Sequence, residues 1–161
     1  MFDQNLKNKA AEIISLLQEK KLRLCCAESC TGGLLSALFT DVTNASKVFD
    51  RGFITYCNQA KIDLLEVKAE TLEDHGAVSG ETAREMALGA LKNSQADISV
   101  AITGIAGPGG GSEKKPVGLV YIAYGKTNLE PLVKKYNFSG DRQSVRFSTV
   151  KKALDDLKDF I

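Results

Sequence analysis

Three segments of the chain carry apolar residues at helical spacing. In each segment the apolar side chains recur every three or four residues, which predicts a helix with one apolar face. Ser79 is a good N-cap for the middle helix, and Asp141 lies at the start of the last one. The three apolar faces are Leu6, Ala10, Ile13, Ile14 and Leu17 in residues 3–20; Ala83, Met86, Ala87, Ala90 and Leu91; and Phe147, Val150, Leu154, Leu157 and Ile161.

Short runs rich in strand-compatible residues separate these helices. The clearest run alternates Ile98, Val100 and Ile102 with smaller residues, which is typical of a strand. The predicted strands are residues 22–27, 48–56, 97–103, 117–124 and 132–138. Shorter helices are predicted over residues 34–39, after a cap at Asn58, and over residues 69–74.

The order of these elements predicts the fold class. Helices connect the first three strands, which makes those strands parallel, whereas a short link joins the last two as an antiparallel pair. We therefore expect an α/β fold, a three-layer α/β/α sandwich with a mixed, mostly parallel central sheet. The 161 residues, of which 43% are hydrophobic, indicate a single domain spanning residues 1–161.

Charge narrows the class of partner. The chain has 21 basic and 20 acidic residues, and the basic residues are dispersed. A nucleic-acid groove or a membrane-surface patch requires clustered positive charge, so we expect a small-molecule partner, no nucleic acid and no membrane. No apolar run is long enough for a spanning helix, and the polar start is not a secretory signal. The expected location is the cytoplasm.

The four cysteines do not resemble a metal site. All of them fall within residues 25–57, and Cys25 and Cys26 are adjacent, so they would point to opposite faces of a strand. We expect reduced thiols, no metal and no cofactor. A cysteine redox or metal protein remains an alternative hypothesis.

Polar residues follow three of the predicted parallel strands. Ser29, Tyr56 and Thr103 all lie at carboxyl ends, where open α/β sheets bind their ligands. The topology therefore predicts that separate parts of the sequence converge on one rim of the sheet.

Ser29 lies between a strand and a helix, as a nucleophile does in strand-turn-helix hydrolases. We expect the backbone N–H groups of Cys30, Thr31, Gly32 and Gly33 to lack intrahelical partners, so that they can form an oxyanion hole. The surrounding sequence does not match GxSxG. The alternative is that Ser29 or Thr31 only caps the helix.

A serine nucleophile requires a base. The single histidine, His75, is expected at an exposed helix end, so a Ser-His-Asp triad is not indicated. Lys61 is the remaining candidate, because a place in the first turn of its helix would lower the pKa of its amine. Tyr56 is a candidate for relaying the proton or binding substrate. The alternative makes Lys61 an exposed surface residue.

Two further features concern anions. The glycine-rich loop 104–111 matches neither a Walker A motif nor GxGxxG, although it would let the backbone approach a ligand closely. Arg142, at the start of the last helix, opposes the helix dipole, an arrangement that favours a nearby anion such as a phosphate. The alternative is an exposed arginine.

Six motifs, spread in order over nearly the whole chain, resemble those of the CinA carboxy-terminal domain family, whose characterised members are nicotinamide mononucleotide amidohydrolases. Cys57 replaces the serine of some relatives, and longer members carry an additional amino-terminal domain whose activity is not transferred. The resemblance covers nearly the whole chain and is carried by residues 27–33 (AESCTGG), 51–61 (RGFITYCNQAK), 75–79 (HGAVS), 103–108 (TGIAGP), 116–118 (PVG) and 138–142 (FSGDR).

The resemblance implies hydrolysis of the nucleotide's carboxamide to nicotinate mononucleotide and ammonia. It implies Ser29 as nucleophile, with Tyr56 and Lys61 supporting proton transfer. It also implies that Thr103, Gly104 and Arg142 hold the substrate, and that the protein is a possible homodimer. The alternative is a non-catalytic nucleotide-binding or competence-related interaction protein.

Overall fold

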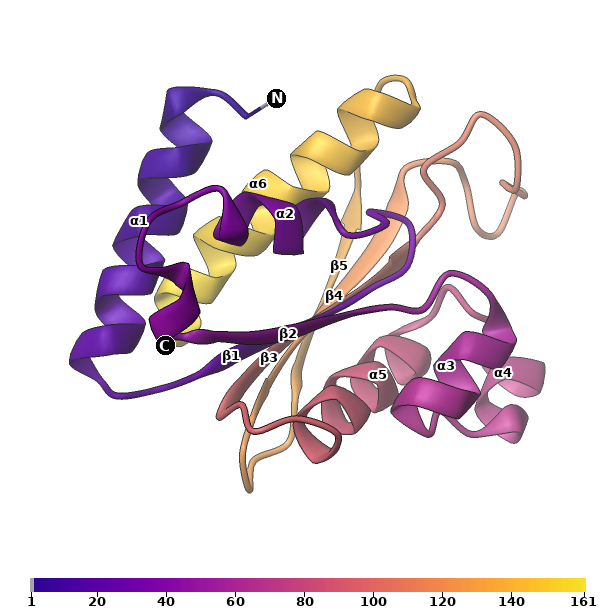
Figure 1. The fold of residues 1–161 in the computed structure, drawn as a ribbon. Helices are drawn as coiled ribbons and strands as arrows, with labels where there is room; N and C mark the ends of the chain where they lie inside the picture. Colours follow the sequence, from indigo (N-terminus) through magenta and orange to yellow (C-terminus); the bar gives the residue numbers. More distant parts are fainter. Residues whose placement is uncertain (1) are drawn as a thin grey trace.

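The computed structural model, which describes residues 2–161, places one five-stranded sheet between two layers of helices (Figure 1). The strands are β1 (Leu24–Glu28), β2 (Phe49–Ile54), β3 (Ile98–Gly104), β4 (Leu119–Lys126) and β5 (Leu132–Asn137). The helices are α1 (Gln4–Glu19), α2 (Leu34–Thr40), α3 (Asn58–Leu65), α4 (Ala69–His75), α5 (Gly80–Lys92) and α6 (Arg142–Phe160), with a short 3-10 helix at Ala45–Lys47. This arrangement confirms the predicted three-layer α/β/α sandwich.

The sheet is mixed, with strand order β2-β1-β3-β4-β5. β1 pairs in parallel with both β2 and β3, whereas β4 is antiparallel to β3 and to β5. Four strands therefore run in one direction and only β4 runs against them. The carboxyl ends of β1, β2 and β3 consequently lie at the same edge of the sheet, as the order of elements predicted.

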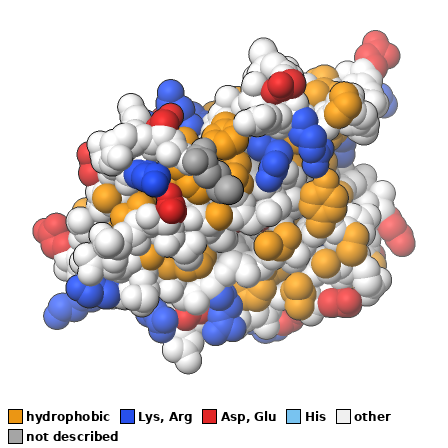
Figure 2. Space-filling view, turned by 45° about the horizontal axis from the view of Figure 1, so that its top comes forward, with side chains coloured by type: hydrophobic (Ala, Val, Ile, Leu, Met, Phe, Trp, Pro, Cys, Tyr) orange, Lys and Arg blue, Asp and Glu red, His pale blue; other side chains and the backbone are white. Residues whose placement is uncertain are grey.

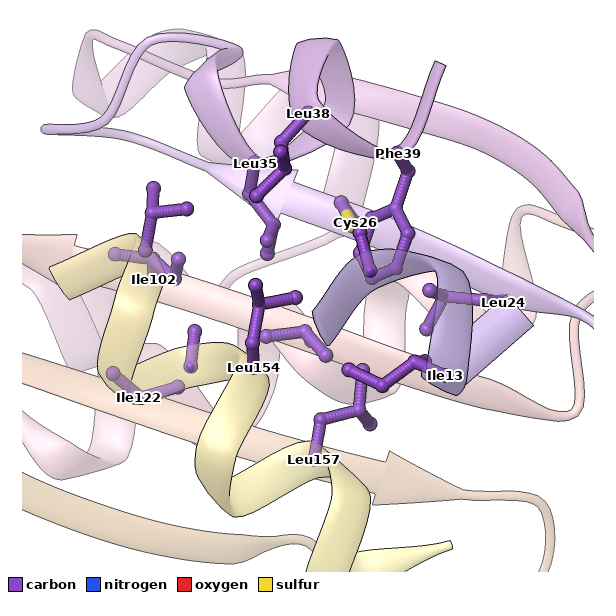
Figure 3. Close-up of a cluster of buried hydrophobic side chains, with 14 of the residues drawn as sticks. Ile13, Leu24, Cys26, Leu35, Leu38, Phe39, Ile102, Ile122, Leu154 and Leu157 are labelled. Carbon is purple, nitrogen blue, oxygen red and sulfur yellow. The ribbon is translucent and has the colours of Figure 1, made fainter. Parts of the chain in front are cut away.

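One face of the sheet is covered by α1, α2 and α6 (Figure 1). Leu24 and Cys26 of β1 point into this layer, where they meet Ile13 of α1, Phe39 of α2 and Leu154 of α6 (Figure 3). All of these side chains are almost completely buried. Burial of this kind contributes roughly 25 cal/mol per Å² of apolar surface, so this core is a principal source of stability.

The opposite face is covered by α3, α4 and α5 and has smaller side chains. Cys25 and Ala27 of β1 face this layer, together with Ala101 of β3 and Ala123 of β4. The small residues let α5 lie close to the sheet, with Ala87 fully buried against it. Adjacent Cys25 and Cys26 therefore do point to opposite faces, as predicted for a strand.

Most predicted elements are present, with ends shifted by one or two residues. The N-cap predicted at Asn58 is wrong, because α3 begins at Asn58 and Cys57 is its cap. The Sγ atom of Cys57 accepts a hydrogen bond from the N–H of Ala60 at 3.4 Å. A thiol therefore takes the place that serine, a common capping residue, would fill. The 3-10 helix was not predicted.

The surface shows no single charged region on the face drawn in Figure 2, where basic side chains are scattered among acidic and apolar ones. Within residues 2–161, none of the helices is both long and apolar enough to cross a membrane.

Candidate active site

A cavity of about 240 Å³ opens at the carboxyl ends of β1, β2 and β3. Ser29, Tyr56 and Thr103 all line it, so the convergence predicted from topology is confirmed. The glycine-rich loop after β3 closes one side, at the right of the sheet in Figure 1. Lys61 and Arg142 are the charged side chains of the lining, which includes no acidic residue among those described. A larger hollow of about 670 Å³ lies on α1 and includes none of the predicted site residues.

Ser29 is held in place by the sheet on both sides. Its N–H donates to the carbonyl of Ile102 in β3 at 3.0 Å, which extends the pairing of β1 and β3 by one residue. The carbonyl of the preceding Glu28 accepts from the N–H of Thr55 at 2.8 Å, which extends β1 and β2 in the same way. Ser29 is only 8% exposed, at the wall of the cavity.

Lys61 is the group next to the Ser29 hydroxyl. Its Nζ atom lies 3.1 Å from Oγ of Ser29 and donates to the carbonyl of Thr55 at 2.8 Å. The side chain is 1% exposed, so the alternative of a solvated surface lysine is wrong. Burial disfavours the ammonium and lowers the pKa of Lys61. The predicted direction is confirmed, but its main cause is desolvation rather than the helix dipole.

The turn after Ser29 offers fewer free donors than predicted. The N–H of Gly32 donates to the carbonyl of Ser29 at 3.0 Å, and the N–H of Gly33 donates to Oε2 of Glu28 at 3.1 Å. The expectation of unpaired N–H groups is therefore wrong for Gly32 and Gly33. For Cys30 and Thr31 it holds, since neither N–H donates to another of the described residues.

Tyr56 and Arg142 form the mouth of the cavity. The guanidinium of Arg142 donates from Nη2 to the Tyr56 hydroxyl at 2.9 Å and from Nη1 to the carbonyl of Gly107 at 2.8 Å. Arg142 thus links the end of β2 to the glycine-rich loop. Tyr56 is 60% exposed, and its recorded hydrogen bond within residues 2–161 is to Arg142 rather than to Ser29 or Lys61.

Thr103 and Gly104 have structural roles that the sequence did not reveal. The Thr103 hydroxyl donates to the carbonyl of Ala77 at 2.6 Å, which joins β3 to the segment after α4. A Cβ atom on Gly104 would lie 2.8 Å from the carbonyl oxygen of Leu119 in β4. Glycine at this position is therefore required by the close approach of β4.

Two residues at the site were missed from the sequence. Glu28 is completely buried, and its carboxylate accepts hydrogen bonds at the start of α2. Arg146, one turn after Arg142 in α6, donates from Nη2 to the carbonyl of Thr31 at 2.7 Å. The four-residue spacing places both arginines on one side of α6 and was the available signal for Arg146.

The buried cysteines give no support to the alternative of a cysteine redox or metal protein. Burial raises the pKa of Cys25 and that of Cys30 to about 11, and it raises the pKa of Cys26 as well. Such thiols are not the thiolates that redox and metal chemistry require. No group of three possible metal ligands occurs in the part of the chain that is described. His75 ends α4 and faces Glu81, outside the cavity lining.

Comparison with known proteins assigns the family. The sequence model of the CinA C-terminal domain matches residues 6–161. The chain belongs to this family. It is 45% identical to the nicotinamide-nucleotide amidohydrolase PncC of Enterobacter agglomerans, an alignment that covers 100% of this chain and 99% of that protein.

A solved structure and a longer relative extend the comparison. The competence/damage inducible protein CihA from Agrobacterium tumefaciens is 45% identical and superposes with a TM-score of 0.96, over 99% of this chain and 97% of that chain. A Caldicellulosiruptor bescii protein named for competence damage is 56% identical over 91% of this chain. This chain spans only 35% of that protein, or about a third of the longer relatives that it matches.

Proposed function

We propose that the protein hydrolyses the carboxamide of nicotinamide mononucleotide to give nicotinate mononucleotide and ammonia. The observation that carries this proposal is the pairing of the Ser29 hydroxyl with the buried amine of Lys61 at 3.1 Å. Similarity to PncC over the full length of both chains supports the choice of substrate. Such a reaction requires an activated nucleophile and donors for an oxyanion, roles that we assign to Ser29 beside Lys61 and to the N–H groups of Cys30 and Thr31.

In the proposed first step, Oγ of Ser29 attacks the carboxamide carbon while Lys61, uncharged, takes the hydroxyl proton. The negative oxygen that forms is stabilised by the free N–H groups of Cys30 and Thr31. The Lys61 ammonium then returns its proton to the departing nitrogen, and ammonia leaves an acyl group on Ser29. Lys61, rather than Tyr56, is the first proton acceptor because it is the group within reach of Oγ.

In the second step the same groups act on water. Neutral Lys61 takes a proton from water, and the resulting hydroxide attacks the acyl carbon. The tetrahedral intermediate collapses when the Ser29 oxygen leaves with the proton from Lys61. The products are the free serine and the carboxylic acid, which ionises at neutral pH.

The cavity's shape supports an aromatic amide at the end of a longer ligand. Its volume of about 240 Å³ is small for a whole mononucleotide, since pockets for drug-sized ligands occupy roughly 300–1,000 Å³. The pyridine ring would therefore lie within the cavity, against Ala77, Val78 and Ala106. The ribose phosphate would extend towards Arg142 and Tyr56 at the mouth, where a guanidinium suits a phosphate.

The direct test is incubation of the purified protein with nicotinamide mononucleotide. We expect one ammonia per nicotinate mononucleotide formed, measured by a coupled ammonia assay and by mass spectrometry of the nucleotide. Saturable binding of the nucleotide without ammonia release would contradict this proposal and favour a non-catalytic nucleotide-binding protein.

Replacing Arg142 by glutamine is expected to weaken phosphate recognition. A hydrogen bond to a charged group contributes about 1.5–3 kcal/mol, so the KM for nicotinamide mononucleotide should rise about 10- to 100-fold. The inhibition constant of nicotinamide riboside, which lacks the phosphate, is the internal control and should change little. An equal loss for nucleotide and riboside would show that Arg142 only supports Tyr56 and Gly107.

A further inference from the structure

The side chain of Glu28 lies beneath the turn that carries Ser29, and it has no part in the chemical steps above. It is fully buried at the end of β1. None of the basic residues within 2–161 forms an ion pair with it. Its carboxylate instead accepts four hydrogen bonds from the start of α2. Oε2 accepts from the N–H groups of Gly33 and Leu35, both at 3.1 Å, and Oε1 accepts from the N–H and hydroxyl of Ser36, at 2.8 and 2.7 Å.

This arrangement replaces the usual helix cap. The N-cap residue of α2 is Gly33, which has no side chain and a left-handed backbone with φ of 91°. The first N–H groups of a helix require acceptors, and here a carboxylate five residues earlier supplies them. A negative charge at this end of a helix is also favoured by the helix dipole.

The hydrogen bonds that Glu28 accepts fix the backbone that follows Ser29. The sheet already fixes the backbone that precedes it, through the Ser29 N–H and the Glu28 carbonyl. The serine is therefore held between two anchored segments. Arg146 of α6 adds a further anchor by donating to the carbonyl of Thr31.

The same bonds decide which donors remain free. The N–H groups of Gly33, Leu35 and Ser36 are all used by Glu28, and that of Gly32 is used by Ser29. The N–H groups of Cys30 and Thr31 donate to no other residue within 2–161. We propose that Glu28 is a positioning residue, which holds the turn so that these two N–H groups form the oxyanion hole beside Ser29. This inference rests on the proposed serine mechanism.

The test replaces Glu28 by glutamine, which keeps the length of the side chain. In either orientation the new amide NH₂ would face a backbone N–H, that of Ser36 or those of Gly33 and Leu35, so donor would oppose donor and the turn would shift. Loss of one oxyanion donor lowers kcat by roughly 10²–10³-fold, and a shift of about 1 Å has a comparable effect. We therefore expect kcat to fall about 100-fold with KM within about threefold of wild type.

Asp3→Asn is the matched control. Asp3 also caps a helix through its carboxylate, which accepts from the N–H of Leu6 at 2.8 Å, but it caps α1. Asparagine caps a helix about as well as aspartate, so Asp3→Asn should keep the Tm and the kcat of the wild type. Glu28→Gln should lower Tm, because its buried side chain makes four hydrogen bonds, and it should also lower kcat at 25 °C, where circular dichroism checks that the variant is folded.

A second readout is independent of the natural substrate. A fluorophosphonate reacts with Oγ of Ser29 as fluoride leaves, and its phosphoryl oxygen occupies the oxyanion hole. The rate of labelling should fall in Glu28→Gln by a factor similar to that for kcat. Wild-type labelling and kcat in folded Glu28→Gln would overturn the inference.

Two further outcomes are also decisive. If Glu28→Gln does not fold, Ser36→Ala removes one of the four donors and is expected to slow labelling three- to tenfold, whereas a wild-type rate would overturn the inference. If the wild-type protein releases no ammonia from nicotinamide mononucleotide, the proposed substrate is wrong. The labelling rates would still show whether Glu28 positions Ser29.

Discussion

The Ser29→Ala variant is expected to lose at least about 10⁴-fold in kcat for nicotinamide mononucleotide, with the fold unchanged. Removing the nucleophile of a serine hydrolase eliminates the covalent route, and losses near 10⁶-fold are known for such variants. The measurement is ammonia release under saturating substrate, together with circular dichroism. Activity near wild type would exclude the serine mechanism.

A matched control for this variant is Ser15→Ala. Ser15 is an exposed serine of α1, where its hydroxyl donates to the carbonyl of Ala11 at 3.0 Å. Its replacement removes the same atom from a helix that contributes no residue to the cavity lining. Ammonia release by Ser15→Ala should match that of the wild type. The loss in Ser29→Ala would then come from the missing nucleophile and not from a difference in how the variants were prepared.

The Lys61→Met variant is expected to lose about 10³-fold in kcat while keeping its fold. Methionine matches the unbranched shape of lysine but has no amine, so it removes the base, whose contribution is typically 10²–10⁴-fold. The variant leaves the Thr55 carbonyl without its donor, yet it also removes a buried amine that is costly to charge. Lys92→Met, at an exposed lysine paired with Glu66, is the control and should keep full activity.

The pH dependence of Lys61 has a defined sign. Its pKa in the folded protein lies below the ordinary value of 10.5, so the unfolded chain binds more protons between these two values. The free energy of unfolding therefore rises with pH across that window, and Lys61→Met should lack this rise. Activity should increase with pH in the same direction, because only the neutral amine accepts the serine proton. A wild-type pH profile that does not rise would contradict the role of Lys61 as base.

The sequence predicted the layers of this fold because apolar spacing is a local signal. Ile98, Val100 and Ile102 alternate and are buried as β3 in the structure. The start of α3 was placed one residue too late, because a cysteine is seldom considered as an N-cap. The 3-10 helix at Ala45–Lys47 has only three residues, too few for a periodic pattern.

Only the part of the site that depends on strand order could be predicted from the sequence. Strand order brought Ser29, Tyr56 and Thr103 to one edge of the sheet, but no local property of Lys61 indicates that it is buried. Its burial follows from how α3 folds back against the ends of β1 and β2, where the amine meets Ser29 and the Thr55 carbonyl. The hydrogen bonds that Glu28 accepts from the start of α2 depend likewise on how the chain folds back after Ser29, so they have no signature in residue spacing.

The absence of acidic side chains from the described cavity lining has a consequence for turnover. In the proposed reaction a neutral amide becomes a carboxylate, so the product leaves with one more negative charge than the substrate had on entry. Arg142 at the mouth, and Lys61 whenever it is protonated, attract that additional charge. We therefore expect added salt to speed release of the product by screening the attraction.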